Sequence, residues 1–175
     1  GEVRERIQAH IGAMQVTARA VAEIDCLYSL ACAAHNNRYV RPALNRDNII
    51  RIDDGRHPII EQYSRDEVFV PNDVTLNHKD HEVLVITGPN MAGKSTFMRQ
   101  VAVLVLMTQI GSFIPAKSAS VCPVDRIFTR IGASDDILAG QSTFMTEMKE
   151  VSYILRHATA RSLLILDEIG RGTST

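Results

Sequence analysis

The 175-residue chain is long enough for one ordinary domain or for a domain with an attached element. Hydrophobic residues make up 45% of it, which suits a packed core and excludes an intrinsically disordered chain. Its net charge of −1 leaves no chain-wide electrostatic footprint for nucleic acid. The longest apolar run, Val101–Met107, is too short to cross a bilayer, and the N-terminus shows no signal-peptide pattern. We therefore expect a soluble cytoplasmic protein without a membrane partner. Three cysteines without C-x-x-C spacing predict reduced thiols.

Residues 2 to about 35 predict one long helix. Apolar residues recur at steps of three and four from Val3 to Ala31, and the segment holds no proline. At about 1.5 Å per residue the helix spans on the order of 50 Å. Asn36-Asn37 ends it, and Pro42 prevents an easy continuation. A helix of this length with one apolar stripe must lie against something large, as a packing helix or as a strut between domains.

The hydrophobic period changes after this helix. The runs at 49–52, 59–60, 67–70 and 74–76 predict short strands, with turns at 53–55 and 77–80. Together they predict a small, mostly antiparallel subsheet. Later in the chain, strands are expected at 82–87, 126–131 and 163–166, and helices at 94–110 and 143–158. The first of these helices is apolar all round at 101–107 and is expected to be buried. Alternating strands and helices favour an α/β fold with a parallel central sheet.

A phosphate-binding loop follows the strand expected at 82–87. The segment Gly88-Pro89-Asn90-Met91-Ala92-Gly93-Lys94-Ser95 matches G-x-x-x-x-G-K-[ST], between an apolar strand and a helix. Its glycines allow backbone N–H groups to converge on phosphate oxygens, and the helix N-terminus favours an anion. Lys94 is expected to reach the β- and γ-phosphates. The Ser95 hydroxyl is a hard oxygen ligand suited to Mg²⁺. The pattern therefore predicts binding of ATP with magnesium.

Two carboxylates follow the apolar strand expected at 163–166. Adjacent side chains in a strand point to opposite faces, so Asp167 and Glu168 need not share one role. Asp167 fits the aspartate that holds Mg²⁺ in P-loop enzymes. Glu168 is then the residue that polarises or orients the attacking water. These two residues and Lys94 are separated by about 73 positions, a spacing that fits a P-loop ATPase.

Three strings in the chain resemble one family. They are TGPNMAGKSTFMRQ at 87–100, DDILAGQSTFMTEM at 135–148 and LDEIGRGTST at 166–175. They are similar to the ATPase domain of the MutS family of DNA mismatch-repair proteins, which belongs to the ABC superfamily. The resemblance runs along essentially the whole chain. GRHPIIE at 55–61 is similar to the family's entry into the ATPase domain, and the N-terminal helix resembles the end of its lever segment.

The resemblance implies roles for individual residues. Asn90 and Thr96 join the nucleotide-binding loop, and Phe69 resembles the aromatic residue that stacks on adenine, although an ordinary core role stays open for it. Ser142 resembles the serine that reaches the γ-phosphate held by the other subunit of a dimer. Ser142-Thr143 also suits a helix cap, with Thr146 or Glu147 in the first turn, and both roles are compatible. The string at 170–174 resembles the loop that communicates between the two active sites.

Together these features predict a helical lever or connector segment over 1–45 and a partial P-loop ATPase domain of the ABC superfamily over 46–175. Relative to the family, the chain is expected to be a C-terminally incomplete piece of a longer protein and a poor ATPase by itself. The family implies Mg-dependent ATP hydrolysis by a homodimer or heterodimer joined through the ATPase domain. It also implies a MutL-type partner, and mismatched double-stranded DNA bound through other domains, which makes the protein nucleoid-associated when on DNA.

Three alternatives differ in their sequence signatures. An ABC transporter ATPase is expected to carry an LSGGQ-type string, where this chain has AGQSTF at 139–144. A chromosome-structure ATPase is expected to place a long coiled coil between its nucleotide motifs, which here lie only about 73 residues apart. A MutS paralogue acting in recombination stays open, and an F-x-E mismatch-binding motif upstream distinguishes the repair branch from it.

Overall fold

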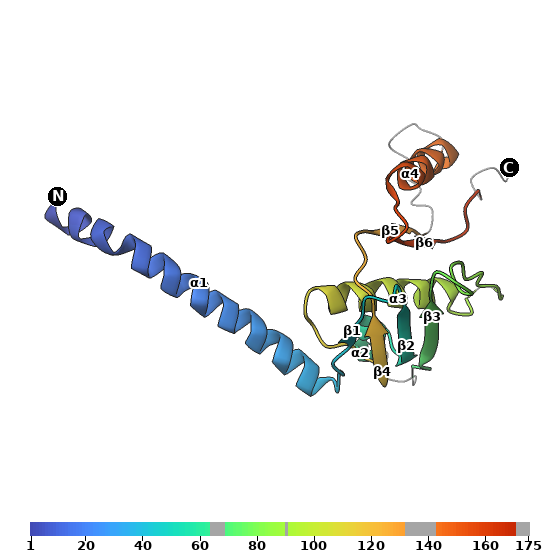
Figure 1. Ribbon diagram of the computed structural model, residues 1–175, viewed down its shortest axis with the longest axis horizontal. Helices are drawn as coiled ribbons and strands as arrows, with labels where there is room; N and C mark the ends of the chain where they lie inside the picture. The colour runs from blue at the N-terminus through green and yellow to red at the C-terminus, as the bar shows by residue number, and fades with distance from the viewer. Residues whose placement is uncertain (64–68, 90, 132–142, 171–175) are drawn as a thin grey trace. The chain divides into compact units, whose positions relative to one another are not determined.

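The computed structural model describes residues 1–63, 69–89, 91–131 and 143–170, and the chain divides into two compact units, Gly1–Tyr39 and Val40–Thr175. The first unit is the helix α1, Glu2–Asn36 (Figure 1). The long helix and its end were predicted correctly. The Asn37 side chain and the Asn37 backbone amide both donate to the Ala33 carbonyl, at 2.8 Å and 3.1 Å, and so cap the last turn. The apolar stripe of α1 is exposed, at Val3 and Met14 among others.

The second unit begins with a four-stranded sheet in the order β1-β4-β2-β3. The strands are β1 (Ala43–Leu44), β2 (Ile50–Gly55), β3 (Asn72–Leu76) and β4 (Ser118–Val121). β2 pairs antiparallel with β3 and β4, while β1 pairs parallel with β4. The mostly antiparallel subsheet is therefore confirmed. β1 and β4 were not predicted, because strands this short carry no readable alternation. Through β1, residues 43–44 pair with Ser120 and Val121 of β4.

Two local predictions around β2 are wrong. The turn expected at Asp53-Asp54-Gly55 lies inside β2, where a register shift between Ile52 and Gly55 absorbs it as a bulge, with φ of 48° at Asp54. The strand expected at 59–60 is instead the first part of helix α2 (Pro58–Tyr63). Proline suits a first helical position, and Nδ1 of His57 accepts the Ile59 amide at 3.3 Å. This local cap outweighs the strand preference of two isoleucines.

Other short predictions had mixed outcomes. The strand expected at 74–76 is confirmed as part of β3. The turn at 77–80 is also confirmed, because the Asn77 side-chain oxygen accepts the amides of Lys79 and Asp80 at 2.8 Å. In the strand expected at 67–70, residues 67 and 68 lie outside the described residues. Phe69 and Val70 are coil.

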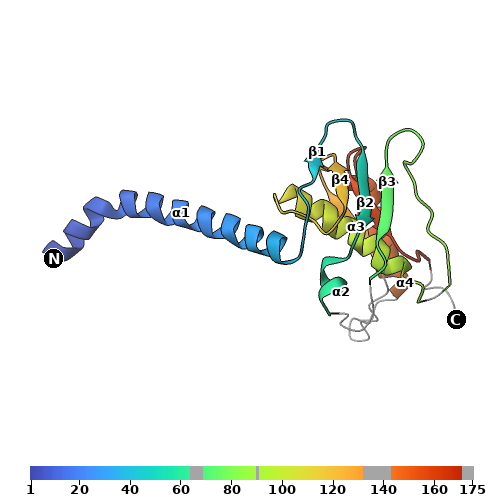
Figure 2. The ribbon, with the colours of Figure 1, turned by 90° about the horizontal axis from the view of Figure 1, so that it is seen from below.

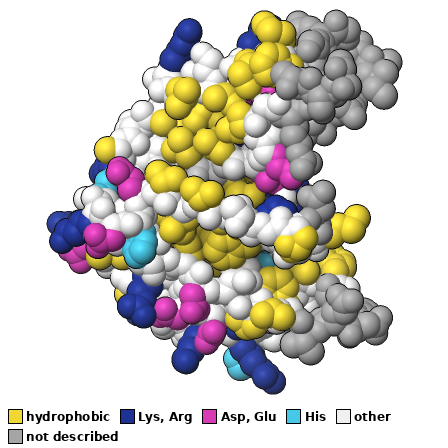
Figure 3. Space-filling model, turned by 90° about the vertical axis from the view of Figure 1, so that its right-hand side faces the viewer, with side chains coloured by type: hydrophobic (Ala, Val, Ile, Leu, Met, Phe, Trp, Pro, Cys, Tyr) yellow, Lys and Arg dark blue, Asp and Glu magenta, His cyan; other side chains and the backbone are white. Residues whose placement is uncertain are grey.

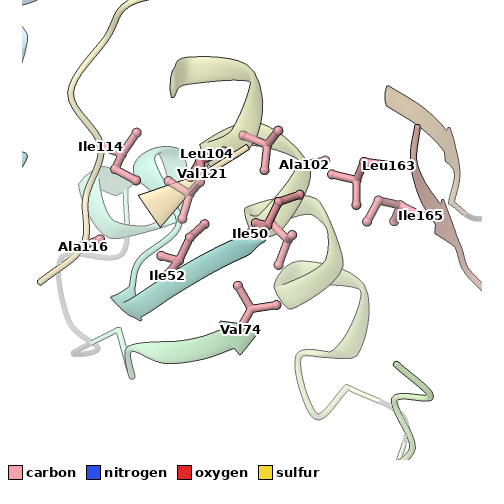
Figure 4. Packing of buried hydrophobic residues seen from close by; sticks show 12 residues of the cluster. Ile50, Ile52, Val74, Ala102, Leu104, Ile114, Ala116, Val121, Leu163 and Ile165 are labelled. Atoms are coloured by element: carbon pink, nitrogen blue, oxygen red, sulfur yellow. The ribbon is translucent and has the colours of Figure 1, made fainter. Parts of the chain in front are cut away.

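The helix α3 (Lys94–Gln109) packs against both sheets of this unit. The second sheet is a parallel pair, β5 (Ile127–Arg130) and β6 (Leu163–Leu166), and helix α4 (Thr143–His157) packs against β5. All four elements were predicted. Figures 1 and 2 show α3 along the four-stranded sheet, and Figure 4 shows Ile50 and Val74 facing α3 from that sheet while Leu163 and Ile165 face it from the other side. Burial of Leu104 and Val105 confirms the buried helix, although Leu106 is 51% exposed.

The strand expected at 82–87 is not formed among the described residues. Residues 83–87 are coil, and Val83 and Val85 are 78% and 83% exposed. A strand gains its stability from pairing and from burial of its faces, and this run has neither here. The architecture is therefore a mixed α/β fold with a parallel pair in place of the larger parallel sheet. In the described part of the chain, no helix has the length and apolar character that a membrane span requires.

Candidate nucleotide-binding site

The loop before α3 makes a tight turn with left-handed backbone at two residues. Gly93 is the N-cap of α3 with φ of 87°, a left-handed conformation that favours glycine. Met91 also has a positive φ, 64°, which is strained for a residue with a side chain. The Ala92 amide donates to the Pro89 carbonyl at 3.3 Å and closes the turn. Asn90 lies outside the described residues. The curled backbone presents the free N–H groups at the start of α3.

Lys94 folds its side chain back over this loop. Its ammonium nitrogen donates to the carbonyl oxygens of Gly88 at 2.8 Å and Pro89 at 2.7 Å. The positive charge therefore lies at the loop itself, beside the start of α3, where the helix dipole also favours an anion. Thr96 lies in the first turn of α3 and is half-buried.

Ser95 and Asp167 meet although 72 residues separate them. The Ser95 hydroxyl donates a short hydrogen bond to the Asp167 carboxylate. Asp167 comes directly after β6, and its amide donates to the Arg130 carbonyl at 2.8 Å, which continues the pairing with β5. The fold thus brings together the two predicted magnesium ligands, one from each half of the motif pair. Two hard oxygen ligands in contact form a set that suits Mg²⁺.

Glu168 lies in a turn that leaves the end of β6. Its φ of 50° is in the left-handed region, and Gly170 follows with φ of 87°. The Gly170 amide donates to the Glu147 carboxylate of α4 at 2.6 Å, and Glu147 is only 5% exposed. Sequence reasoning gave Glu147 no role beyond a possible helix cap. A glutamate in a helical segment is usually exposed, so the sequence does not indicate a role for Glu147 until its burial and its partner are known.

Two other residues, Phe69 and Ser142, were predicted to belong to the site. Phe69 is half-buried in the coil before β3, and its stacking on adenine stays a prediction. Ser142 lies outside the described residues, directly before the first residue of α4. Figure 3 views the side of the molecule on which the segment leading into α3 lies, and hydrophobic side chains are exposed there in several patches.

His57 supplies a titratable group at the edge of the fold, outside the loop. It is 6% exposed, and burial lowers the pKa of its imidazole, with a further contribution from the positive charge of Arg99 on α3. A neutral ring is also what the cap of α2 requires, because Nδ1 must accept a hydrogen bond there. The structure supports a structural role for this histidine.

Known proteins resemble the chain over nearly its whole length. A family model described as MutS domain V matches residues 84–175. The chain is 60% identical over 174 residues to a DNA mismatch repair protein MutS of Alkaliphilus metalliredigens, covering 99% of this chain and 20% of that protein. It is 58% identical, over the same shares, to the protein of that name from Acetivibrio thermocellus. The Clostridium perfringens protein is 53% identical, with 99% of this chain and 19% of that protein covered.

The chain spans about a fifth of the length of these curated relatives. The matched range contains both halves of the site, from the loop at 88–95 to the carboxylates at 167 and 168. It also contains α3, α4 and the parallel pair β5–β6. The chain therefore belongs to the MutS domain V family.

Proposed function

We propose that this chain is the ATP-binding and ATP-hydrolysing domain of a DNA mismatch recognition protein, in which the ATP cycle is coupled to DNA clamping and repair signalling. The observation that carries the proposal is the contact between Ser95 and Asp167. It joins the phosphate loop to the end of β6, as a P-loop ATPase requires. The names of the relatives supply the mismatch-repair context.

The phosphate loop binds the nucleotide. Residues 88–96 surround the phosphates with amide groups, and Lys94 exchanges its two carbonyl partners for phosphate oxygens. Phe69 stacks on the adenine. Ser95 and Asp167 hold Mg²⁺, which neutralises charge on the phosphate oxygens when bound.

Hydrolysis depends on the residues that follow β6 and on a second subunit. Glu168 orients the water for in-line attack on the γ-phosphate, and Lys94 stabilises the charge that develops. Ser142 of a partner subunit completes the site in trans, so the active form is a homodimer or a family heterodimer. The isolated chain is then a poor ATPase.

We also propose that residues 83–87 become a strand of a parallel central sheet when nucleotide binds, which completes the P-loop fold of the domain over 46–175. In the described residues β6 pairs only with β5, and the run at 83–87 is exposed and rich in β-branched residues. The contact of Ser95 with Asp167 joins the start of α3, which follows this run, to the end of β6. Amide hydrogen exchange at residues 83–87 is expected to slow at least tenfold on addition of ATP and Mg²⁺. Unchanged exchange with bound nucleotide would contradict this part.

The whole-protein roles concern parts beyond this chain. Mismatched double-stranded DNA is bound through other domains, with α1 within the lever segment over 1–45, and a MutL-type protein receives the signal. The protein works in the cytoplasm, associated with the nucleoid when on DNA.

The central experiment tests binding and hydrolysis separately. ATP binding is measured with the purified chain, and turnover with a replacement chimera, a full-length relative in which this chain replaces the matched segment. Glu168→Ala is expected to retain binding and to lower hydrolysis at least tenfold, because the water loses its orienting group. Glu23→Ala removes an exposed carboxylate from α1 and is the matched control, with both properties unchanged. Lost binding with unchanged turnover per bound site would reverse the role given to Glu168.

The repair assignment has its own test. The chimera is titrated with a G·T-mismatched and a matched duplex, with and without ATP. We expect tighter binding to the mismatch and a change in that preference on ATP addition. Equal affinity for both duplexes would refute the repair role and leave the ATPase role standing.

A further inference from the structure

Glu147 is a buried carboxylate with a defined backbone partner. It lies in the second turn of α4, is 5% exposed, and accepts the Gly170 amide at 2.6 Å. A buried polar group is costly unless it is hydrogen-bonded, and the 2.6 Å bond gives the Glu147 carboxyl group its partner. Glu147 therefore makes a specific connection between α4 and the turn after β6.

Glu168, the residue proposed to orient water, lies between two backbone amides that are held by hydrogen bonds. On one side, the Asp167 amide is held by the Arg130 carbonyl at 2.8 Å. On the other side, the Gly170 amide is held by Glu147. Only Glu168 and Ile169 lie between these two fixed points, and Glu168 has a φ of 50° that surrounding contacts must maintain. The backbone at Glu168 is thus held from both sides by these hydrogen bonds.

The same helix has an independent contact with β5. Glu150, one turn further along α4, pairs with Arg130 at 2.9 Å, and its side chain is 51% exposed. This pair helps to hold α4 on β5, whereas Glu147 joins α4 to the turn at 168–170. A change at Glu150 therefore tests loosening of α4 by itself, while a change at Glu147 combines that loosening with release of the Gly170 amide.

We infer that Glu147 is a positioning residue for ATP hydrolysis, which holds the turn carrying Glu168 in its working conformation through the Gly170 amide. The inference rests on the proposed ATPase function. Glu147 touches no substrate; it acts through the backbone on Glu168. Because a misplacement of about 1 Å costs on the order of a hundredfold in rate, loss of this bond lowers kcat far more than it weakens ATP binding.

The test compares three substitutions at this position in the replacement chimera. Glu147→Ala removes the acceptor, and Glu147→Asp keeps the carboxyl group but shortens the side chain by one methylene. Both are expected to lower kcat at least tenfold, with KM for ATP changed less than threefold. Glu147→Gln retains an oxygen acceptor and is expected to restore kcat to within threefold of the unsubstituted protein. Glu150→Ala, the matched control on the same helix, is expected to leave kcat unchanged.

A spectroscopic measurement on the purified chain follows the bond itself. The Gly170 amide proton is expected far downfield, to move upfield in Glu147→Ala and Glu147→Asp, and to stay close to its position in Glu147→Gln. Equal losses of kcat in the Gln and Ala variants, or an unmoved Gly170 signal, would overturn the inference, as would a kcat that survives Glu147→Asp. A chimera without any ATP turnover would refute the proposed function first, and this inference with it.

Discussion

Replacement of Gly55 by alanine tests how closely the start of the GRHP segment packs on α3. A Cβ built on Gly55 lies 2.9 Å from Nε2 of Gln100, 3.0 Å from Cγ2 of Ile52 and 3.2 Å from the Asn72 carbonyl. All three approaches are shorter than the 3.4 Å at which ordinary contact begins. Gln100 is 1% exposed and Ile52 fully buried, so neither side chain has free space to enter.

The expected cost follows from this crowding. Inserting a methyl group into a packed core costs about 1–3 kcal/mol of unfolding free energy. The double variant Gly55→Ala with Gln100→Ala relieves the shortest contact, so its loss should be smaller than the sum of the two single losses by at least about 0.5 kcal/mol. Gly12→Ala is the control for the glycine-to-alanine change, since no atom lies within 4 Å of its added Cβ.

The assay must report on the second unit alone. The chain has no tryptophan, and α1 contributes 35 residues to any helix signal, so circular dichroism would mix the units. Urea unfolding followed through the methyl NMR signals of Ile52 and Val74 avoids this, because both side chains lie in the core of the second unit. An unchanged midpoint in Gly55→Ala, or strictly additive losses in the double variant, would refute the packing argument.

Two further predictions concern the same unit. Leu104→Ala empties a fully buried position on α3 between the two sheets and should cost about 3–5 kcal/mol, measured by the same urea titration, whereas Leu106→Ala, at a position 51% exposed, should cost much less. Burial lowers the pKa of His57, so the unfolded chain binds more protons than the folded chain below pH 6.5. The stability that His57 contributes is therefore complete above pH 6.5, the ordinary pKa of histidine, and is lost as the pH falls below that value. His57→Asn keeps a cap acceptor that does not titrate, and it should flatten the slope of stability between pH 5 and 7, about the usual range of a histidine; an equal slope in both proteins would contradict the role given to His57.

The local elements could be predicted because their signals are local. The helices α1, α3 and α4 show the apolar spacing of a helix, whose hydrogen bonds join residues four apart. The strand β6 was predicted at its observed bounds because four apolar residues stand between polar neighbours. The phosphate loop was readable for the same reason: its two glycines, Lys94 and Ser95 lie within residues 88–95, and α3 begins at Lys94.

The secondary-structure predictions were wrong where contacts with other segments of the chain determine the conformation. Ser118–Val121 is a strand only because β1 and β2 lie on either side of it, and the apolar run at 82–87 is coil because no neighbour pairs with it among the described residues. The isoleucines at 59 and 60 favour a strand by propensity, but the cap at His57 and the proline after it start a helix. Strand propensity reflects the surroundings of a residue more than its own backbone preference.

The long helix, the phosphate loop and the two carboxylates after β6 can be read from the sequence alone, since each is a pattern within one continuous stretch of the chain. Folding alone brings Ser95 to Asp167 across 72 positions and Glu147 to the Gly170 amide across 23. Contacts of this kind follow from how α3, α4 and the β5–β6 pair are packed together. That packing depends on burial summed over many residues, and no short stretch of the sequence contains it.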